Sequence, residues 1–187
     1  MPVRCPWVPA DNPLYISYHD KEWGVPVHDD KTHFEFLILE GAQAGLSWQT
    51  ILTRRQGYKQ AFANFNPKKV AKFTKRDFNK LIKNSSIIRN KLKINAAISN
   101  AQHFLEIQQE FGSFDKYIWN FVKNKTINNK LKTIKDYPVF IKSAEMLSKD
   151  LKNRGFKFVG PTIIYAHMQA CGLVNDHAIN CFRHNQV

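Results

Sequence analysis

The chain has 187 residues, of which 43% are hydrophobic and 13% aromatic, and its formal net charge is +13. This length and composition are enough for a buried core and exclude a disordered polymer. The longest purely apolar runs fall far short of the roughly 20 residues that a membrane-spanning helix needs, and residues 1–13 contain no apolar core of a signal peptide. We therefore expect one cytoplasmic domain over residues 1–187, without membrane contact.

Apolar periodicity and capping residues predict a succession of helices with short connections. The expected helices cover 31–44, 47–64, a short segment from Asn66-Pro67, 75–83, 89–110, a segment from Ser113, 143–154 and a last helix that Gly160-Pro161 opens and Gly172 ends. Thr74 and Asp77 are spaced as a capping box, and residues 123–142 resemble an irregular polar connection. Because alternating strand patterns are almost absent, we predict an all-α fold.

The positive charge is concentrated in one part of the chain. Residues 51–100 hold 13 basic and one acidic side chains, whereas residues 1–50 hold three basic and seven acidic ones. Such a basic field attracts polyanions, of which nucleic acid is the commonest for a basic domain. The alternative is a solvated, lysine-rich helical surface.

The last two predicted helices are joined by residues 155–160, in which two glycines flank an apolar tip. Gly155 and Gly160 allow a close approach of another backbone, the free amides at the start of the second helix can bind phosphate, and Lys157 adds charge. This pattern predicts a helix-hairpin-helix grip on DNA. A plain helical hairpin with a glycine C-cap is the alternative.

Three cysteines form a poor disulfide framework and suit a reducing compartment. His177 and Cys181 are four residues apart, which on a helix places an imidazole and a thiol on one face, as in half of a tetrahedral zinc site. Cys5 and His19 offer the other half from the opposite end of the chain. Coincidence is the alternative, because buried cysteine is often ordinary packing, as we expect for Cys171.

Aromatic residues cluster in the first quarter of the chain. They are Trp7, Tyr15, Tyr18, Trp23 and Trp48. Glu40 falls among them, on the predicted buried face of a helix. Aromatic rings with a buried carboxylate could hold a flat, electron-poor or cationic base. Alternatively, the rings are core and Glu40 caps a helix or pairs with a surface arginine. The remaining histidines, His28, His33, His103, His167 and His184, are assigned to the surface or to satisfied core positions.

Five strings of the sequence resemble the bacterial 3-methyladenine DNA glycosylase I family. They are RCPW (4–7), YHDKEWGVP (18–26), LEGAQAGLSW (39–48), RGFKFVG (154–160) and MQACGLVNDH (168–177). The resemblance covers essentially the whole chain in order. It implies an all-α, helix-hairpin-helix glycosylase fold whose termini are joined by one structural zinc ion, held by Cys5, His19, His177 and Cys181.

The resemblance also assigns the site residues. It implies that Glu40 is the catalytic carboxylate of the base pocket and that its walls are Tyr18, Trp48, Trp7, Tyr15 and Trp23. The intercalating loop corresponds to Gly45 and Leu46, and the DNA-binding hairpin to Gly155, Lys157 and Gly160. The family lacks the catalytic aspartate of many related glycosylases, so Asp176 is not expected to be catalytic.

The activity that this resemblance implies is hydrolysis of the N-glycosidic bond of 3-methyladenine in double-stranded DNA after base flipping, with release of free 3-methyladenine and an abasic site. A cationic leaving group needs no protonation, and we expect hydrolysis by water without a lyase step. We expect a monomer. A non-catalytic, zinc-stabilised DNA-binding module is the alternative. A glycosylase for oxidised or mismatched bases is disfavoured because an uncharged leaving group needs a stronger acid and base.

Overall fold

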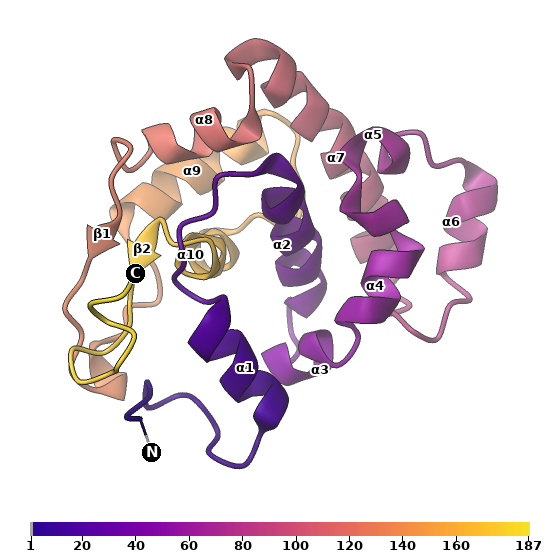
Figure 1. The fold of residues 1–187 in the computed structure, drawn as a ribbon. Coiled ribbons are helices and arrows are strands. Elements are labelled where there is room, and N and C mark those ends of the chain that lie inside the picture. Colours follow the sequence, from indigo (N-terminus) through magenta and orange to yellow (C-terminus); the bar gives the residue numbers. More distant parts are fainter. Residues whose placement is uncertain (1) are drawn as a thin grey trace.

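Helices make up most of the computed structural model, which describes residues 2–187 (Figure 1). The α-helices are α1 (Pro13–Lys21), α2 (Asp30–Gln43), α3 (Trp48–Leu52), α4 (Arg55–Ala61), α5 (Pro67–Val70), α6 (Lys75–Leu81), α7 (Lys91–Phe111), α8 (Phe114–Asn120), α9 (Lys142–Asn153) and α10 (Pro161–Ala170). Two 3₁₀ turns cover Ala63–Phe65 (η1) and Ile134–Asp136 (η2). The strands β1 (Ile127–Asn128) and β2 (Val174–Asn175) form a short parallel pair. The all-α prediction is thus confirmed, with this pair as the only sheet among residues 2–187.

Several helix starts lie where their capping residues predict them. Asn66 accepts a hydrogen bond from the backbone of α5, and Ser113 does so for α8. Thr74 and Asp77 form the predicted capping box of α6. Each cap satisfies an amide that would otherwise lack a partner at a helix start, which is why short polar side chains before an apolar run locate these elements correctly.

The predicted single helix over 47–64 is wrong, because the chain breaks after α3 and resumes as α4. Thr53 Oγ1 donates to the carbonyl oxygens of Gln49 and Thr50, an arrangement that competes with helix continuation. Arg54 reaches across to the carbonyl of Ser85. These tertiary and local hydrogen bonds redirect the chain although its apolar spacing is helical.

The structure differs from the predicted secondary structure in three further places. Ser143 lies inside α9 rather than at its N-cap, which is Ile141 and makes no side-chain cap. His177 and Cys181 do not lie on a helix, because residues 176–187 form turns and irregular loop. Asn175 Oδ1 accepts a hydrogen bond from the His177 amide at the start of this segment. Helix α1, which was not predicted, is capped by Asn12.

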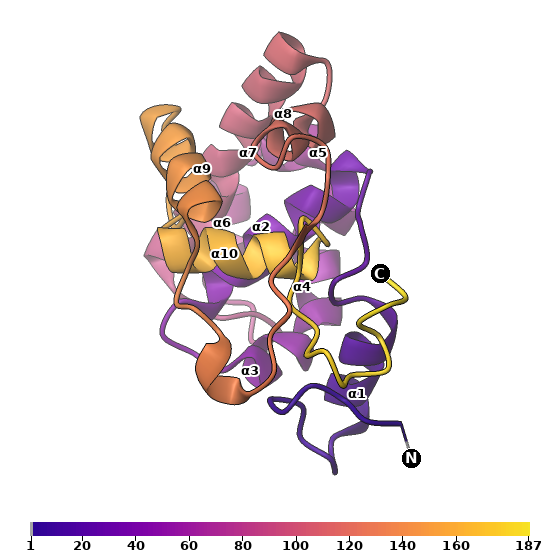
Figure 2. The same ribbon diagram turned by 90° about the vertical axis from the view of Figure 1, so that its left-hand side faces the viewer.

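Helices α2 and α10 pack against one another, and α9 lies alongside α10 (Figures 1 and 2). The two termini lie at the same end of the molecule, and α4, α5 and α6, which carry much of the basic segment, lie at the opposite end. In Figure 2 the connection from α8 to α9 crosses α10 before it returns. Between residues 2 and 187, no helix is both long and apolar enough to cross a membrane.

Candidate active site and metal centre

A cavity of about 430 Å³ opens between α1, α2, α3, α10 and the segment 134–139. Its walls are mainly apolar and aromatic. The lining residues are Trp7, Tyr15, Tyr18, Trp23, Glu40, Gln43, Trp48, Ile134, Tyr137, Pro138, Val139, Thr162, Tyr165, Ala166 and Gln169. A pocket with apolar walls and a few polar groups is the usual form of a site for a small ligand.

The five clustered aromatic residues and Glu40 all line this cavity. Trp7 forms one aromatic group with Trp23 and Tyr15, at ring-centroid distances of 4.7 and 5.8 Å. Tyr18 and Trp48 form another, with centroids 5.4 Å apart. The rings of each pair are inclined to one another, so faces as well as edges are available to a flat ligand.

Glu40 projects from α2 into the cavity wall and is only 3% exposed. Its Oε2 lies 3.0 Å from Nδ1 of His167 on α10, while Oε1 has no hydrogen-bond partner among the described residues. Burial raises the pKa of the Glu40 carboxyl group well above its usual range, because desolvation disfavours the charged form. The partner is thus a buried histidine rather than a surface arginine.

Two other buried polar atoms on the cavity wall lack partners among residues 2–187. They are Nε1 of Trp48 and the hydroxyl of Tyr137. Buried polar groups are normally paired. An unpaired carboxyl oxygen, an indole N–H and a phenol around one cavity therefore indicate a ligand that both donates and accepts hydrogen bonds.

Sequence reasoning missed His167 and Tyr137. The sequence assigns His167 to the surface or to a satisfied core position, and its spacing on α10 gives no sign that it faces Glu40. Tyr137 follows η2 in an irregular connection whose path no periodicity predicts. Asp176 is fully buried and accepts hydrogen bonds from Tyr165, Gln169 and Asn129, so its carboxylate is satisfied within the scaffold.

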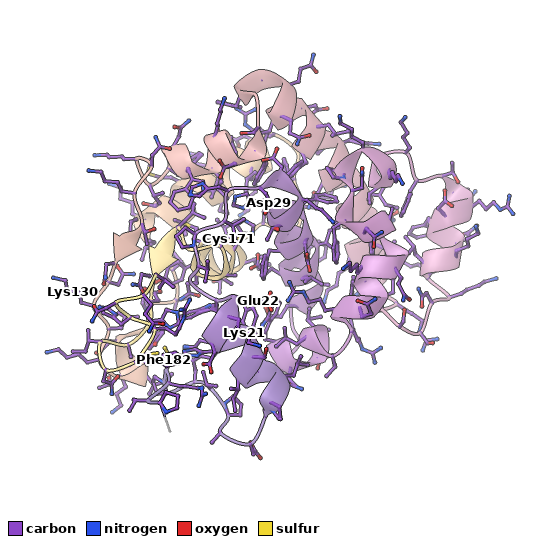
Figure 3. The ribbon with its side chains drawn as sticks, viewed as in Figure 1. Lys21, Glu22, Asp29, Lys130, Cys171 and Phe182 are labelled. Carbon is purple, nitrogen blue, oxygen red and sulfur yellow. The ribbon has the colours of Figure 1, made fainter. Side chains whose placement is uncertain are left out.

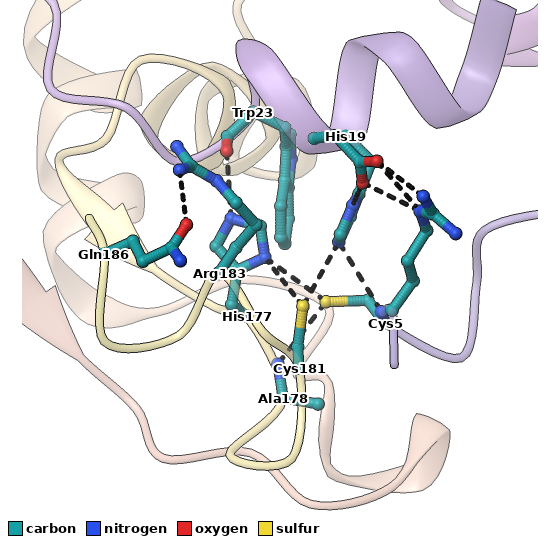
Figure 4. A network of polar contacts seen from close by, with 10 residues as sticks. Cys5, His19, Trp23, His177, Ala178, Cys181, Arg183 and Gln186 are labelled. Atoms are coloured by element: carbon teal, nitrogen blue, oxygen red, sulfur yellow. Dashed lines mark hydrogen bonds and ion pairs between the residues drawn. The ribbon is translucent and has the colours of Figure 1, made fainter. Parts of the chain in front are cut away.

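A second constellation lies where the chain termini meet (Figure 4). Cys5, His19, His177 and Cys181 are all buried, and their ligand atoms lie within 4.8 Å of one another. Sγ of Cys5 is 3.5 Å from Nδ1 of His177. Sγ of Cys181 is also 3.5 Å from that atom and from Nε2 of His19.

This spacing fits a tetrahedral metal ion. Zinc bonds of about 2.3 Å to sulfur and about 2.0 Å to nitrogen place sulfur and nitrogen ligands about 3.5 Å apart. The other ring nitrogens are held as well, with His19 Nδ1 at 2.7 Å from Asp20 and His177 Nε2 at 2.9 Å from the carbonyl of Trp23. Such outer partners fix the ring orientation of metal-binding histidines. The four groups could therefore hold a metal.

Helices α9 and α10 are joined by a tight hairpin. Gly155 adopts φ +94°, and a Cβ there would lie 2.7 Å from Nε2 of His103, so glycine is required. The side chain of Asn100 forms two 2.8 Å hydrogen bonds with the backbone of the exposed Lys157. Its Nδ2 donates to the Lys157 carbonyl, and its Oδ1 accepts from the Lys157 amide. Gly160 caps α10 with φ −61° and has open space where a Cβ would lie.

The loop between α2 and α3 presents Gly45 and Leu46 at the surface. Gly45 adopts φ +76°, and the side chain of Leu46 is 40% exposed. The loop lines a smaller cavity that also reaches Glu40, which brings an exposed apolar side chain close to the carboxyl group along the α2 C-terminus.

The fold and the site define a helical protein with a pocket lined by aromatic side chains, and with a buried cluster of two cysteines and two histidines that could hold a metal where the termini meet. The methyladenine glycosylase family model matches residues 7–184, and the chain belongs to this family. The chain is 48% identical over 178 residues to DNA-3-methyladenine glycosylase 1 of Escherichia coli (strain K12), covering 95% of each chain.

Solved structures agree with this assignment. A crystal structure of 3-methyladenine DNA glycosylase I matches with a TM-score of 0.93 and 46% identity, covering 96% of this chain and 98% of the other. A Staphylococcus aureus 3-methyladenine DNA glycosylase I structure, described as showing the basis of 3-methyladenine recognition, matches with a TM-score of 0.90 and 39% identity over 92% of both chains.

Proposed function

We propose that this protein is a DNA-3-methyladenine glycosylase that flips the damaged nucleotide into the aromatic cavity and hydrolyses its N-glycosidic bond. The observation that carries the proposal is the buried, unpaired Oε1 of Glu40 on the wall of an aromatic pocket, in a chain of the methyladenine glycosylase family. A partnerless carboxyl oxygen destabilises the empty protein, and a bound base with a hydrogen-bond donor offsets this cost.

The chemistry follows from the charge of the substrate. An N3-alkylated adenine in DNA is a cation, and cleavage of its bond to C1′ returns the electron pair to the base, which leaves as neutral 3-methyladenine. Water adds to the sugar and one proton is released. Glu40 in its ionised form stabilises the cation, whereas neutral adenine offers this group a weaker partner. No lysine is among the cavity-lining residues within 2–187, which favours hydrolysis over imine formation.

The aromatic groups supply stacking. Trp48 and Tyr18 stand beside Glu40 in the cavity and are suited to hold the ring of the flipped base, while Trp7, Tyr15 and Trp23 form the other wall. Base–aromatic stacking contributes about 1–3 kcal/mol per base. The hydroxyl of Tyr137 offers a further polar contact at the edge of the base.

Two surface segments are suited to contact the DNA duplex. Lys157 on the hairpin, with the flanking Gly155 and Gly160, provides a phosphate contact that positions the duplex. Leu46, beside Gly45, presents an apolar side chain that can occupy the space left by the extruded nucleotide. Extrusion costs a few kcal/mol and is least costly at a damaged pair.

The metal of the terminal cluster is zinc in this proposal. Two thiolates and two imidazoles are a zinc-type ligand set, and four protein ligands leave no position for substrate. When bound, the ion supplies a cross-link between the N-terminal segment and the C-terminal loop. Cys5 and His19 on one side and His177 and Cys181 on the other would hold it.

Incubation with methylated double-stranded DNA, followed by identification of released bases, tests the proposed function. We expect free 3-methyladenine and abasic sites that break only on later alkali treatment. Binding without base release would support the non-catalytic DNA-binding module instead. Release of oxidised or mismatched bases, but not of 3-methyladenine, would support the other glycosylase class.

A further inference from the structure

A row of polar groups connects the cavity with the surface through the core. Glu40 Oε2 lies 3.0 Å from His167 Nδ1, and His167 Nε2 lies 3.3 Å from Nδ1 of His33 on α2. Nε2 of His33 lies 3.5 Å from Oδ1 of Asp115 on α8. Both histidine side chains are fully buried, whereas Asp115 is 21% exposed and also meets the exposed His28.

One arrangement of protons links Glu40, His167 and His33 in the empty protein. Burial raises the pKa of Glu40 and lowers that of His167, to about 3, and of His33, so all three are neutral. Glu40 then donates its proton to His167 Nδ1, and His167 donates from Nε2 to His33 Nδ1. The remaining proton of His33, on Nε2, lies toward Asp115 Oδ1, 3.5 Å away, without a hydrogen bond.

We propose that His167 and His33 form a proton relay through which Glu40 transfers its proton to His33 when a cationic base enters the cavity. Glu40 Oε2–H passes its proton to His167 Nδ1, and His167 passes the proton on its Nε2 to His33 Nδ1. The result is a Glu40 carboxylate, a neutral His167 and a His33 imidazolium beside Asp115. One proton moves inward from the pocket and none is gained or lost.

This transfer gives Glu40 the two forms that the reaction needs. The nucleotide in DNA is cationic and requires a carboxylate, whereas the free base that forms is neutral. A base that fills the cavity also blocks exchange of protons with solvent through its mouth. The relay lets the carboxyl group change its state while the pocket is closed, and the inference rests on the proposed role of Glu40.

Burial and the neighbouring His167 lower the pKa of His33, and two carboxylates at the outer end of the relay partly offset this. Asp115 lies near His33, and Asp30, on its own helix, attracts its charge as well. Around the inner end lie the buried thiol of Cys171 and the phenol of Tyr18, both of which burial keeps protonated. Cys171 follows α10 and lies beside the start of α2, where Asp29 caps the helix (Figure 3).

The test is the pH dependence of single-turnover excision of 3-methyladenine from methylated DNA, in which the lesion keeps its charge at every pH. In the wild-type protein the transfer is internal, so the rate is expected to be flat across neutral pH. In His33→Gln the Glu40 proton must leave to solvent. The rate of this variant is then expected to fall about tenfold per pH unit as the pH decreases below the Glu40 pKa.

Tyr58→Phe is the matched control, because it removes a partly buried hydrogen bond, from the Ile88 amide, at a buried residue that does not line the cavity. It is expected to lower stability and leave the rate and its flat pH profile unchanged. A His33→Gln profile that stays flat, even at a lower rate, overturns the relay and leaves the proposed function intact. Absence of excision by the wild-type protein refutes the function instead.

A second measurement does not depend on the variant folding. Ring ¹⁵N shifts of His33 are recorded in the wild-type protein with and without protonated 3-methyladenine at one pH. The relay predicts that ligand binding converts His33 from one protonated ring nitrogen to two, while His167 keeps one. A His33 ring that stays neutral in the complex overturns the proposal.

Discussion

The substitution Glu40→Gln isolates the charge of the pocket from its shape. In the empty protein, a protonated Glu40 donates to His167 Nδ1, at a distance of 3.0 Å. The glutamine NH₂ can make the same donation, which leaves the amide oxygen at the position of Oε1, the oxygen that has no partner among the described residues. The variant therefore keeps one acceptor for the base and loses only the ability to become negative.

The size of the effect follows from this geometry. A hydrogen bond to a charged group contributes about 1.5–3 kcal/mol and a neutral one about 0.5–1.5 kcal/mol. The difference of about 1–1.5 kcal/mol corresponds to a roughly tenfold loss. We expect this loss in the single-turnover excision rate and in affinity for the cationic base.

Glu40→Gln should raise the free energy of unfolding although it lowers activity, and this gain should depend on pH. The unfolded Glu40 titrates near pH 4, and the folded carboxyl group does so at a much higher pH because it is buried. Between these two values the wild-type protein loses up to about 1.4 kcal/mol of unfolding free energy per pH unit, since only the unfolded state releases the proton. Glu40→Gln lacks this loss.

Thermal melts at several pH values measure this difference. The variant should melt with the wild-type protein near pH 4 and increasingly above it as the pH rises. A variant that excises 3-methyladenine at the wild-type rate but melts several degrees lower would refute the reasoning, because Glu40 would then be a structural partner of His167 and not a ligand of the base.

Three other substitutions test the remaining assignments. Cys181→Ala should lose the bound zinc, as measured by elemental analysis, and lower the melting temperature; wild-type protein purified without chelator that contains no zinc would contradict the metal assignment. Trp48→Ala should weaken binding of 3-methyladenine in calorimetry by about 1–3 kcal/mol, while an unchanged affinity would exclude stacking by this ring. Lys157→Ala should weaken binding of all duplexes about equally and reduce the slope of log affinity against log salt by about one, and an unchanged slope would exclude the phosphate contact.

Local signals in the sequence determined the helical class and many element ends. The caps at Asn66, Thr74 and Ser113 act over three or four residues, so a sequence pattern contains all the information that they need. The expected helix over 47–64 failed for the opposite reason. Its break depends on contacts such as that of Arg54 with Ser85, which are distant in sequence.

The residues of the candidate site were largely foreseeable, because their chemistry is distinctive. A buried acid among tryptophans and tyrosines, and a Cys and His pair at each end of the chain, are unusual enough to be noticed without coordinates, and the family strings assign them together. The expected geometry was less accurate, since His177 and Cys181 approach one another through a loop rather than along a helix.

Tertiary structure alone decided which groups surround Glu40. His167 lies 127 residues further along the chain and meets Glu40 only because α10 packs against α2. Tyr137 reaches the cavity from an irregular connection. The sequence by itself determined that a carboxyl group would be buried among aromatic rings. Whether that group is charged, and where its proton goes, depends on side chains brought together by packing over long sequence separations, which no local pattern encodes.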